Sequence, residues 1–236
     1  MNQLLVVNHL LVNINSVIGA LFLLSAVVLM TQRQAQAVLR LFVRQSILLA
    51  VSAFILGWLH HSAELMIVGL ITIVAKAVLI PQLLTRTLGP DIRSRRELDF
   101  IVNTPVSLLI ALGMTVLSYF FVAPLLNGAN QTIAVNLPVG LDVLLIGVYT
   151  LAVRREAVPQ MLAMMAIDNG AFYAGIAITT SSAIVELAAG LEGVMVVLIA
   201  AILARTLAQR VGSTEVSELT HLKEGERIGE KEGESE

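Results

Sequence analysis

The chain contains no cysteine among its 236 residues. This absence excludes disulfide bonds, thiol catalysis, Cys-ligated zinc and iron–sulfur clusters from the chain, and it leaves the redox compartment open. Charge is also scarce, because Asp, Glu, Lys and Arg make up 14% of the residues and no Lys or Arg precedes Arg33. A cleaved signal peptide begins with a basic segment, so we expect the first hydrophobic run to remain as a helix.

Apolar residues dominate what is present. Hydrophobic residues account for 57% of the chain and its mean hydropathy is +0.85, values typical of an integral membrane protein and not of a soluble domain. A hydrocarbon core of roughly 30 Å requires about 20 apolar residues in each helix that crosses it. The sequence predicts an all-α bundle of seven transmembrane helices at residues 8–30, 38–58, 65–86, 103–125, 132–152, 158–180 and 183–206.

Basic residues predict how these helices are oriented. If the seven helices alternate in direction, each of the 15 Lys and Arg residues except Lys76 falls on the same side. The positive-inside rule then places the N-terminus outside and the C-terminus in the cytoplasm, in a multi-pass protein of the cell (inner) membrane. Residues 207–236 are rich in Glu, Gly and Ser, so we expect a disordered acidic cytoplasmic tail after a transmembrane domain at 1–206.

Two segments resemble each other within the chain. VLIPQLLTRTL at 78–88 and VLIAAILARTL at 197–207 agree at seven of eleven positions. Their spacing is compatible with a parallel repeat in which the first three helices correspond to the last three. Chance similarity between apolar helices is the alternative, and both interpretations stay open.

Ionisable side chains stand near the middle of several predicted helices. A charge at the bilayer centre costs roughly 2.5 to 3.5 kcal/mol on insertion scales, so such residues usually face protein or water and serve a function. We predict proton-translocation or charge-coupling roles, with structural ion pairing or hydrogen bonding as the alternative at each position. The residues concerned are Lys76, Asp142, Asp168 and Glu192, with Glu186 near the outer boundary as a candidate outer port.

The remaining polar positions predict less. Asn136 and Pro138 suggest a polar or kinked start to the fifth predicted helix, so we expect water to reach Asp142 from outside. His60 and His61 are expected in a solvated turn, because no third or fourth metal ligand accompanies them. Phosphate-binding loops, nucleophile elbows and cofactor motifs are absent from the sequence, so we expect no catalytic residue, cofactor or metal.

Four stretches carry a resemblance to a known family. They are RQSILLAVSAF at 44–54, ITIVAKAVLIPQLL at 71–84, RREAVPQMLAMMAIDNGAFYAGIAI at 154–178 and VELAAGLEGVMVVLIAAILART at 185–206. Together they resemble the hydrogenase-4 membrane component E family, which is itself similar to the small K-type subunit of respiratory complex I. Two helices of that subunit each carry a buried glutamate. Asp168, followed by Asn169, stands at the first of these positions in place of the glutamate, and Glu192 stands at the second.

The resemblance implies a non-catalytic subunit in the membrane arm of a complex I-like NiFe hydrogenase or formate hydrogenlyase-type complex. Its partners would be antiporter-like and anchor subunits, the lipid bilayer and, indirectly, a peripheral hydrogenase module, with no nucleic acid. Lys76, Asp168 and Glu192 would be charge-coupled sites on a proton path. A self-contained secondary transporter and a purely structural membrane scaffold are the alternatives, and a free-standing membrane enzyme is disfavoured because no nucleophile or cofactor motif accompanies the charges.

Overall fold

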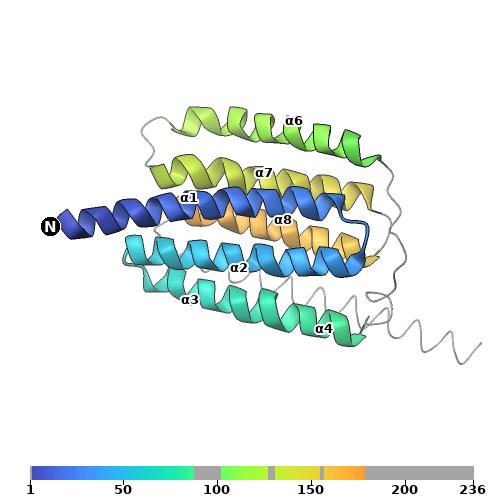
Figure 1. Cartoon of the computed structure of the whole chain (residues 1–236), viewed down its shortest axis with the longest axis horizontal. Helices are drawn as coiled ribbons and strands as arrows, with labels where there is room; N and C mark the ends of the chain where they lie inside the picture. Colours follow the sequence, from blue (N-terminus) through green and yellow to red (C-terminus); the bar gives the residue numbers. More distant parts are fainter. Residues whose placement is uncertain (1, 88–101, 127–130, 155–156, 179–236) are drawn as a thin grey trace, which may run out of the picture. The chain divides into compact units, whose positions relative to one another are not determined.

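A computed structural model of the chain describes residues 2–87, 102–126, 131–154 and 157–178. All of them belong to the first of the two compact units into which the chain divides, Met1–Val196, and no β-strand occurs among them. Within these described residues, six helices are long and apolar enough to cross a membrane (Figure 1). These spans are Val6–Thr31, Ala35–Leu59, Ala63–Arg86, Thr104–Leu126, Ile133–Val153 and Val158–Ile178. They fit a multi-pass membrane protein.

The elements follow the first six predicted helices to within a few residues. In chain order they are α1 (Asn2–Thr31), α2 (Ala35–Leu59), α3 (Ala63–Thr72), the π-helix η1 (Ile73–Leu79), α4 (Ile80–Thr87), α6 (Thr104–Val122), the 3-10 turn η2 (Ala123–Leu126), α7 (Gln131–Val153) and α8 (Ala157–Ile178). The third span is therefore built from α3, η1 and α4. The seventh predicted helix, the internal repeat that depends on it and the acidic tail lie outside the described residues.

Local sequence explains where the third span begins. The side-chain oxygen of Ser62 accepts a hydrogen bond from the backbone N–H of Leu65 at 3.4 Å, which satisfies one of the free donors of the first turn of α3. The turn before it is tight, since His61 adopts a φ of 53°. A Cβ on Gly57 would lie 2.9 Å from Cγ of Met66. A small residue at position 57 thus allows α2 and α3 to run close together.

The helices α7 and α8 pack more closely than any other described pair. A Cβ on Gly140 would lie 2.3 Å from the backbone nitrogen of Ala174, and one on Gly170 would lie 2.5 Å from that of Leu144. Small residues let transmembrane helices approach to backbone contact, where van der Waals packing replaces the hydrophobic effect as the source of association. The glycines therefore fix the approach of α8 to α7.

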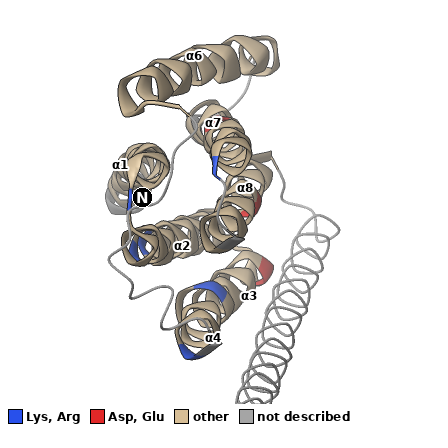
Figure 2. Cartoon of the chain, turned by 90° about the vertical axis from the view of Figure 1, so that its right-hand side faces the viewer, with Lys and Arg blue, Asp and Glu red and all other residues tan. Residues whose placement is uncertain are grey.

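The six spans differ in how much they bury. Viewed along the bundle, α1, α2, α7 and α8 lie together, with α6 beyond α7 and the third span beyond α2 (Figure 2). Of the six spans, α8 is the most buried and α6 the least. The apolar core joins α1, α2, α3, α6, α7 and α8, and the rings of Phe22 and Tyr173 stack at its centre with centroids 4.5 Å apart. Side chains on α8 are consequently the best shielded.

The described basic residues other than Lys76 lie toward one end of the bundle. Arg33 follows α1, Arg86 ends the third span, and Arg154 follows α7. Arg154 is buried, and its Nη2 donates to the carbonyl oxygens of Met30 at 2.9 Å and Gln32 at 2.7 Å. A cation at a helix C-terminus satisfies free carbonyls and opposes the negative end of the helix dipole. The position of these basic residues toward one end agrees with the prediction that successive helices alternate in direction. The outside position of the N-terminus stays a prediction.

Candidate functional site

Lys76 and Asp168 form an ion pair inside the bundle. Nζ of Lys76, on η1, lies 2.5 Å from Oδ2 of Asp168, on α8. Only 2% of Lys76 and 4% of Asp168 is exposed. The helix α2 packs against both η1 and α8, so the long lysine side chain joins two elements that flank α2. Two of the five predicted site residues therefore meet, and their role in proton transfer stays a prediction.

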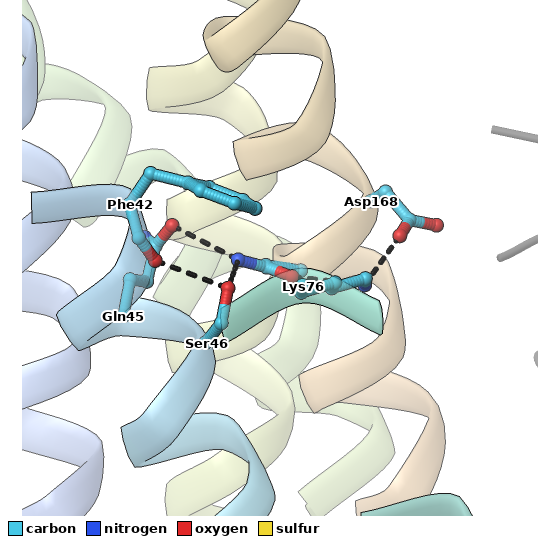
Figure 3. Close-up of polar contacts among 6 residues, drawn as sticks. Phe42, Gln45, Ser46, Lys76 and Asp168 are labelled. Atoms are coloured by element: carbon cyan, nitrogen blue, oxygen red, sulfur yellow. Dashed lines mark hydrogen bonds and ion pairs between the residues drawn. The ribbon is translucent and has the colours of Figure 1, made fainter. Parts of the chain in front are cut away.

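Asn169 completes the environment of the lysine. Nζ of Lys76 also donates to Oδ1 of Asn169 at 2.9 Å. The amide group of Asn169 in turn donates from Nδ2 to Oε1 of Gln45 at 3.2 Å and to Oγ of Ser46 at 3.3 Å (Figure 3). The opposite amide orientation would place an NH₂ group against the ammonium, so the charge of Lys76 fixes how Asn169 points.

The hydrogen bonds continue into α2. Ser46 accepts from Asn169 and donates from Oγ to the backbone oxygen of Phe42 at 3.0 Å, so its single proton is used within its own helix. Residues on α2, η1 and α8 are thus connected in one polar cluster, which we call the Lys76 cluster: Gln45, Ser46, Lys76, Asp168 and Asn169. Burying a charge is tolerated only when it is paired and hydrogen-bonded, and the Lys76 cluster meets that requirement.

Lys76 stands in the π-helical part of the third span. The backbone N–H of Ile80 donates to the carbonyl of Ala75, five residues earlier, and Pro81 follows with no N–H to donate. A proline ring collides with the carbonyl four residues before it, and local π geometry is one way in which transmembrane helices accommodate this. π-helical turns are also frequent at functional sites.

The π-helix also determines which way Lys76 faces. Thr72, Lys76, Ile80 and Leu84 are all buried, at intervals of four residues. In a regular α-helix, positions four apart drift by about 40° at each step, because a turn takes 3.6 residues. The wider π turn offsets this drift, so the four side chains keep facing the bundle. The π-helix was not predicted. The feature of the sequence that could have indicated it is Pro81, in the middle of an apolar run.

Asp142 lies apart from the Lys76 cluster. It is on α7 and is fully buried, and neither of its carboxyl oxygens has a hydrogen-bond partner among the described residues. Its polar neighbours are Thr115 and Tyr119 of α6. Asn136 and Pro138 are buried as well. Pro138 lies inside a continuous α7, and the access of water to Asp142 from the start of this helix stays a prediction.

A second polar cluster joins four helices and was not predicted. Oγ of Ser52 donates to Oδ1 of Asn15 at 2.6 Å, and Nδ2 of Asn15 donates to Oδ1 of Asn136 at 2.9 Å. The hydroxyl of Tyr173 donates to the same Asn136 oxygen at 3.2 Å. These residues come from α2, α1, α7 and α8, so neutral hydrogen bonds hold four spans in register. Asparagines inside two apolar runs were the only sign of it in the sequence.

Other predicted positions contribute no site within the described chain. Glu186 and Glu192 lie outside it. His60, His61 and Glu64 are exposed at the turn between α2 and α3. No group of three or more His, Asp or Glu side chains that could hold a metal occurs among residues 2–87, 102–126, 131–154 and 157–178. The chemistry that the described residues offer is therefore that of buried charge and hydrogen bonding.

Comparison with known proteins gives one similarity of nearly full length. The chain is 28% identical, over 203 residues, to the uncharacterized protein Rv0085 of Mycobacterium tuberculosis (strain ATCC 25618 / H37Rv). The alignment covers 85% of this chain and 92% of that protein, so the similarity extends over most of both. No protein-family model and no solved structure matches the chain.

Proposed function

We propose that the chain is a non-catalytic membrane-arm subunit of a complex I-like hydrogenase or a related redox-driven ion pump, and that it contributes buried charges to proton translocation. The observation that carries this proposal is the Lys76–Asp168 ion pair, 2.5 Å long and buried within apolar spans. The four stretches that resemble hydrogenase-4 component E include both residues and supply the kind of complex. Antiporter-like and anchor subunits of the membrane arm are the proposed partners.

The pair is suited to coupling because each charge stabilises the other. Inside a bundle of low dielectric constant, charges a few ångströms apart interact far more strongly than in water. Transfer of a proton to Asp168 would remove the attraction between its carboxylate and Lys76, while the ammonium keeps its hydrogen bond to Oδ1 of Asn169. The released lysine would then favour ionisation of another acid, for which Glu192 is the candidate from sequence. Protonation at one position is thereby linked to charge at the next.

Neutralising either charge tests the proposal. In the assembled complex, Lys76→Gln and Asp168→Asn should abolish proton pumping into vesicles while the rate of reduction of an artificial electron acceptor is maintained. Arg86→Gln removes an exposed charge from the same span and should leave pumping unchanged. Blue-native electrophoresis establishes whether the chain migrates within a large complex. Unchanged pumping in an assembled complex of either variant would remove the pair from the proton path.

A structural scaffold is the second candidate, and one observation favours it. The described contacts of the Lys76 cluster join three elements, since Asp168 and Asn169 both bind the lysine and Asn169 is held by α2. Buried ion pairs can often be replaced by apolar residues without loss of stability. The double substitution Lys76→Met with Asp168→Leu separates the candidates: a scaffold would assemble and pump normally, whereas a charge-coupling subunit would assemble and fail to pump.

A further inference from the structure

We propose that Asp142 is a proton-binding site, occupied by a proton in this conformation and separate from the Lys76–Asp168 pair. The inference depends on the surroundings of Asp142 alone, so it stands whether or not the chain belongs to a hydrogenase. Asp142 is fully buried on α7, and neither carboxyl oxygen accepts a hydrogen bond from a described residue. An ionised carboxylate held away from water without donors is strongly disfavoured relative to its neutral acid.

The neighbouring hydroxyl on α6 points to the same conclusion. Thr115 lies beside Asp142, and its Oγ1 donates to the backbone oxygen of Ala111 at 3.1 Å. A hydroxyl has a single proton, so Thr115 can offer Asp142 only a lone pair. A carboxylate has no proton to give to that lone pair, whereas a protonated carboxyl has one. The proton of the Thr115 hydroxyl is used within α6, so Thr115 does not supply the donor that an ionised Asp142 would need.

Polar side chains occur at two levels of the contact between α6 and α7, and Asp142 lies at one of them. Near one end of this contact, Oγ of Ser107 and the hydroxyl of Tyr149 are 2.9 Å apart. The two helices run antiparallel (Figure 1). Eight residues along α6 from Ser107 and seven back along α7 from Tyr149 bring Thr115 opposite Asp142. Hydroxyl groups thus occur at two levels of the α6–α7 contact, eight residues apart along α6, with the buried apolar side chains of Ala111 and Ile146 between them.

Few titratable groups share this environment. Tyr119 of α6 is close enough to interact electrostatically with Asp142. On α1, which also packs on α7, the titratable side chain among described residues is His9, and it is exposed. On α8 they are Asp168, which is engaged in the ion pair, and Tyr173, whose hydroxyl donates within the four-helix cluster. No described cation faces Asp142, so a proton is the counter-charge that the described surroundings provide for it.

A proton fits the site better than a metal cation. Hard cations in proteins take about six oxygen ligands, and oxygen atoms of that number are not gathered here by the described residues. Thr115 and Tyr119 of α6 are the polar residues with a recorded interaction with the Asp142 carboxyl. Binding and release of H⁺ at Asp142 is accordingly the chemistry proposed.

Infrared spectroscopy of the full chain in its membrane complex tests the proposal. A protonated carboxyl group has a C=O stretching band above the amide I band, and a carboxylate lacks it. At neutral pH the wild-type protein should show this band, Asp142→Asn should lose it, and Asp168→Asn should keep it because Asp168 is ionised in its pair. The band should shift in D₂O and disappear as the pH is raised, which would show that the proton exchanges with solvent.

Three results would overturn the proposal. The first is a spectrum of the wild type that lacks the band at neutral pH, and the second is a band that persists unchanged in Asp142→Asn. The third is a band that grows when sodium is replaced by choline, which would make the site a cation site. If Asp142→Asn does not accumulate, Asp142→Glu can be used to assign the band. It keeps a carboxyl group at position 142 but should change the frequency of the C=O stretching band. Each result is independent of whether Lys76 and Asp168 take part in pumping.

Discussion

The buried ionisable residues of this bundle differ in whether they have a hydrogen-bond partner among the described residues. Lys76 has a carboxylate and an amide oxygen within hydrogen-bond distance, whereas Asp142 has no donor among the described residues. Breaking a buried pair by removing one member leaves an uncompensated charge, while removing both avoids that penalty. Loss of Asp168 alone should therefore lower the stability of the fold, because it leaves the charge of Lys76 uncompensated. Loss of the Asp142 carboxyl leaves no such charge behind.

At the Lys76–Asp168 pair this difference is measurable as stability. Asp168→Ala leaves the ammonium of Lys76 buried without its counter-ion and should lower the free energy of unfolding by about 3 to 5 kcal/mol. Lys76→Met combined with Asp168→Leu should cost clearly less, since no charge is left behind. The midpoint of thermal unfolding of the detergent-solubilised chain reports both. A double variant that is no more stable than Asp168→Ala would contradict this account of the pair.

At the scale of helices, contact between backbones decides which spans can tolerate larger side chains. The Cβ of an alanine at position 140 would lie 2.3 Å from the nitrogen of Ala174 and 2.7 Å from its Cα, both backbone atoms that cannot rotate away. On α6, by contrast, a Cβ on Gly113 meets no heavy atom within 4 Å. Two glycines in helix interiors thus serve different purposes, one allowing close approach and the other merely occupying a surface.

A matched pair of substitutions distinguishes these glycines. Gly140→Ala should separate α7 from α8 and cost about 1 to 3 kcal/mol or more of stability, the usual range for overpacking. Gly113→Ala should be neutral or stabilise α6 by up to about 1 kcal/mol, because alanine is the better helix former. Fluorescence-detected size-exclusion chromatography after a heating series measures both. Equal thermal midpoints for the two variants would show that the α7–α8 contact is not limiting.

Sequence reasoning located the spans but not the connections between them. Hydropathy predicts six described helices well because each is a long apolar run, and a lysine or aspartate inside such a run is conspicuous. The sequence does not show which buried charges bind each other, since Lys76 and Asp168 are 92 positions apart and neither span contains a feature that indicates the other. The hydrogen bond between Asn15 and Asn136 could not be predicted, because a neutral amide lowers the hydropathy of a span only slightly and indicates no partner. The π-helix depends on backbone bonding that composition does not reveal.

At the scale of the whole described bundle, the arrangement of the turns follows from antiparallel neighbours. The described arginines lie in the α1–α2 turn, in the first half of α2 and at the ends of α4 and α7, and the α2–α3 turn carries none. If the arginine-bearing end faces the cytoplasm, as basic residues favour, the α2–α3 turn is external. The absence of native cysteine makes this arrangement unusually simple to examine, because any introduced thiol is the only one in the chain.

Single cysteines should report the orientation directly. In intact cells, His60→Cys in the exposed α2–α3 turn should react with a membrane-impermeant maleimide, and Gln34→Cys in the exposed α1–α2 turn should not. After the membrane is permeabilised, both should react to similar extents. Mass spectrometry of the labelled protein quantifies the reaction. Labelling of Gln34→Cys alone in intact cells would reverse the predicted orientation and place the N-terminus in the cytoplasm.

The distance along the chain between Lys76 and Asp168 also has a consequence for biosynthesis. The lysine leaves the ribosome 92 residues ahead of its counter-ion, which at roughly 5 to 20 residues per second is a delay of about 5 to 18 s. The third span must enter the bilayer carrying an isolated ammonium during that interval. Its most apolar stretch of 18 residues has a mean hydropathy of 2.3, the highest such value among the six spans, which offsets the cost of the charge. Nascent chains that stop between the two positions would present an orphan cation to membrane quality control.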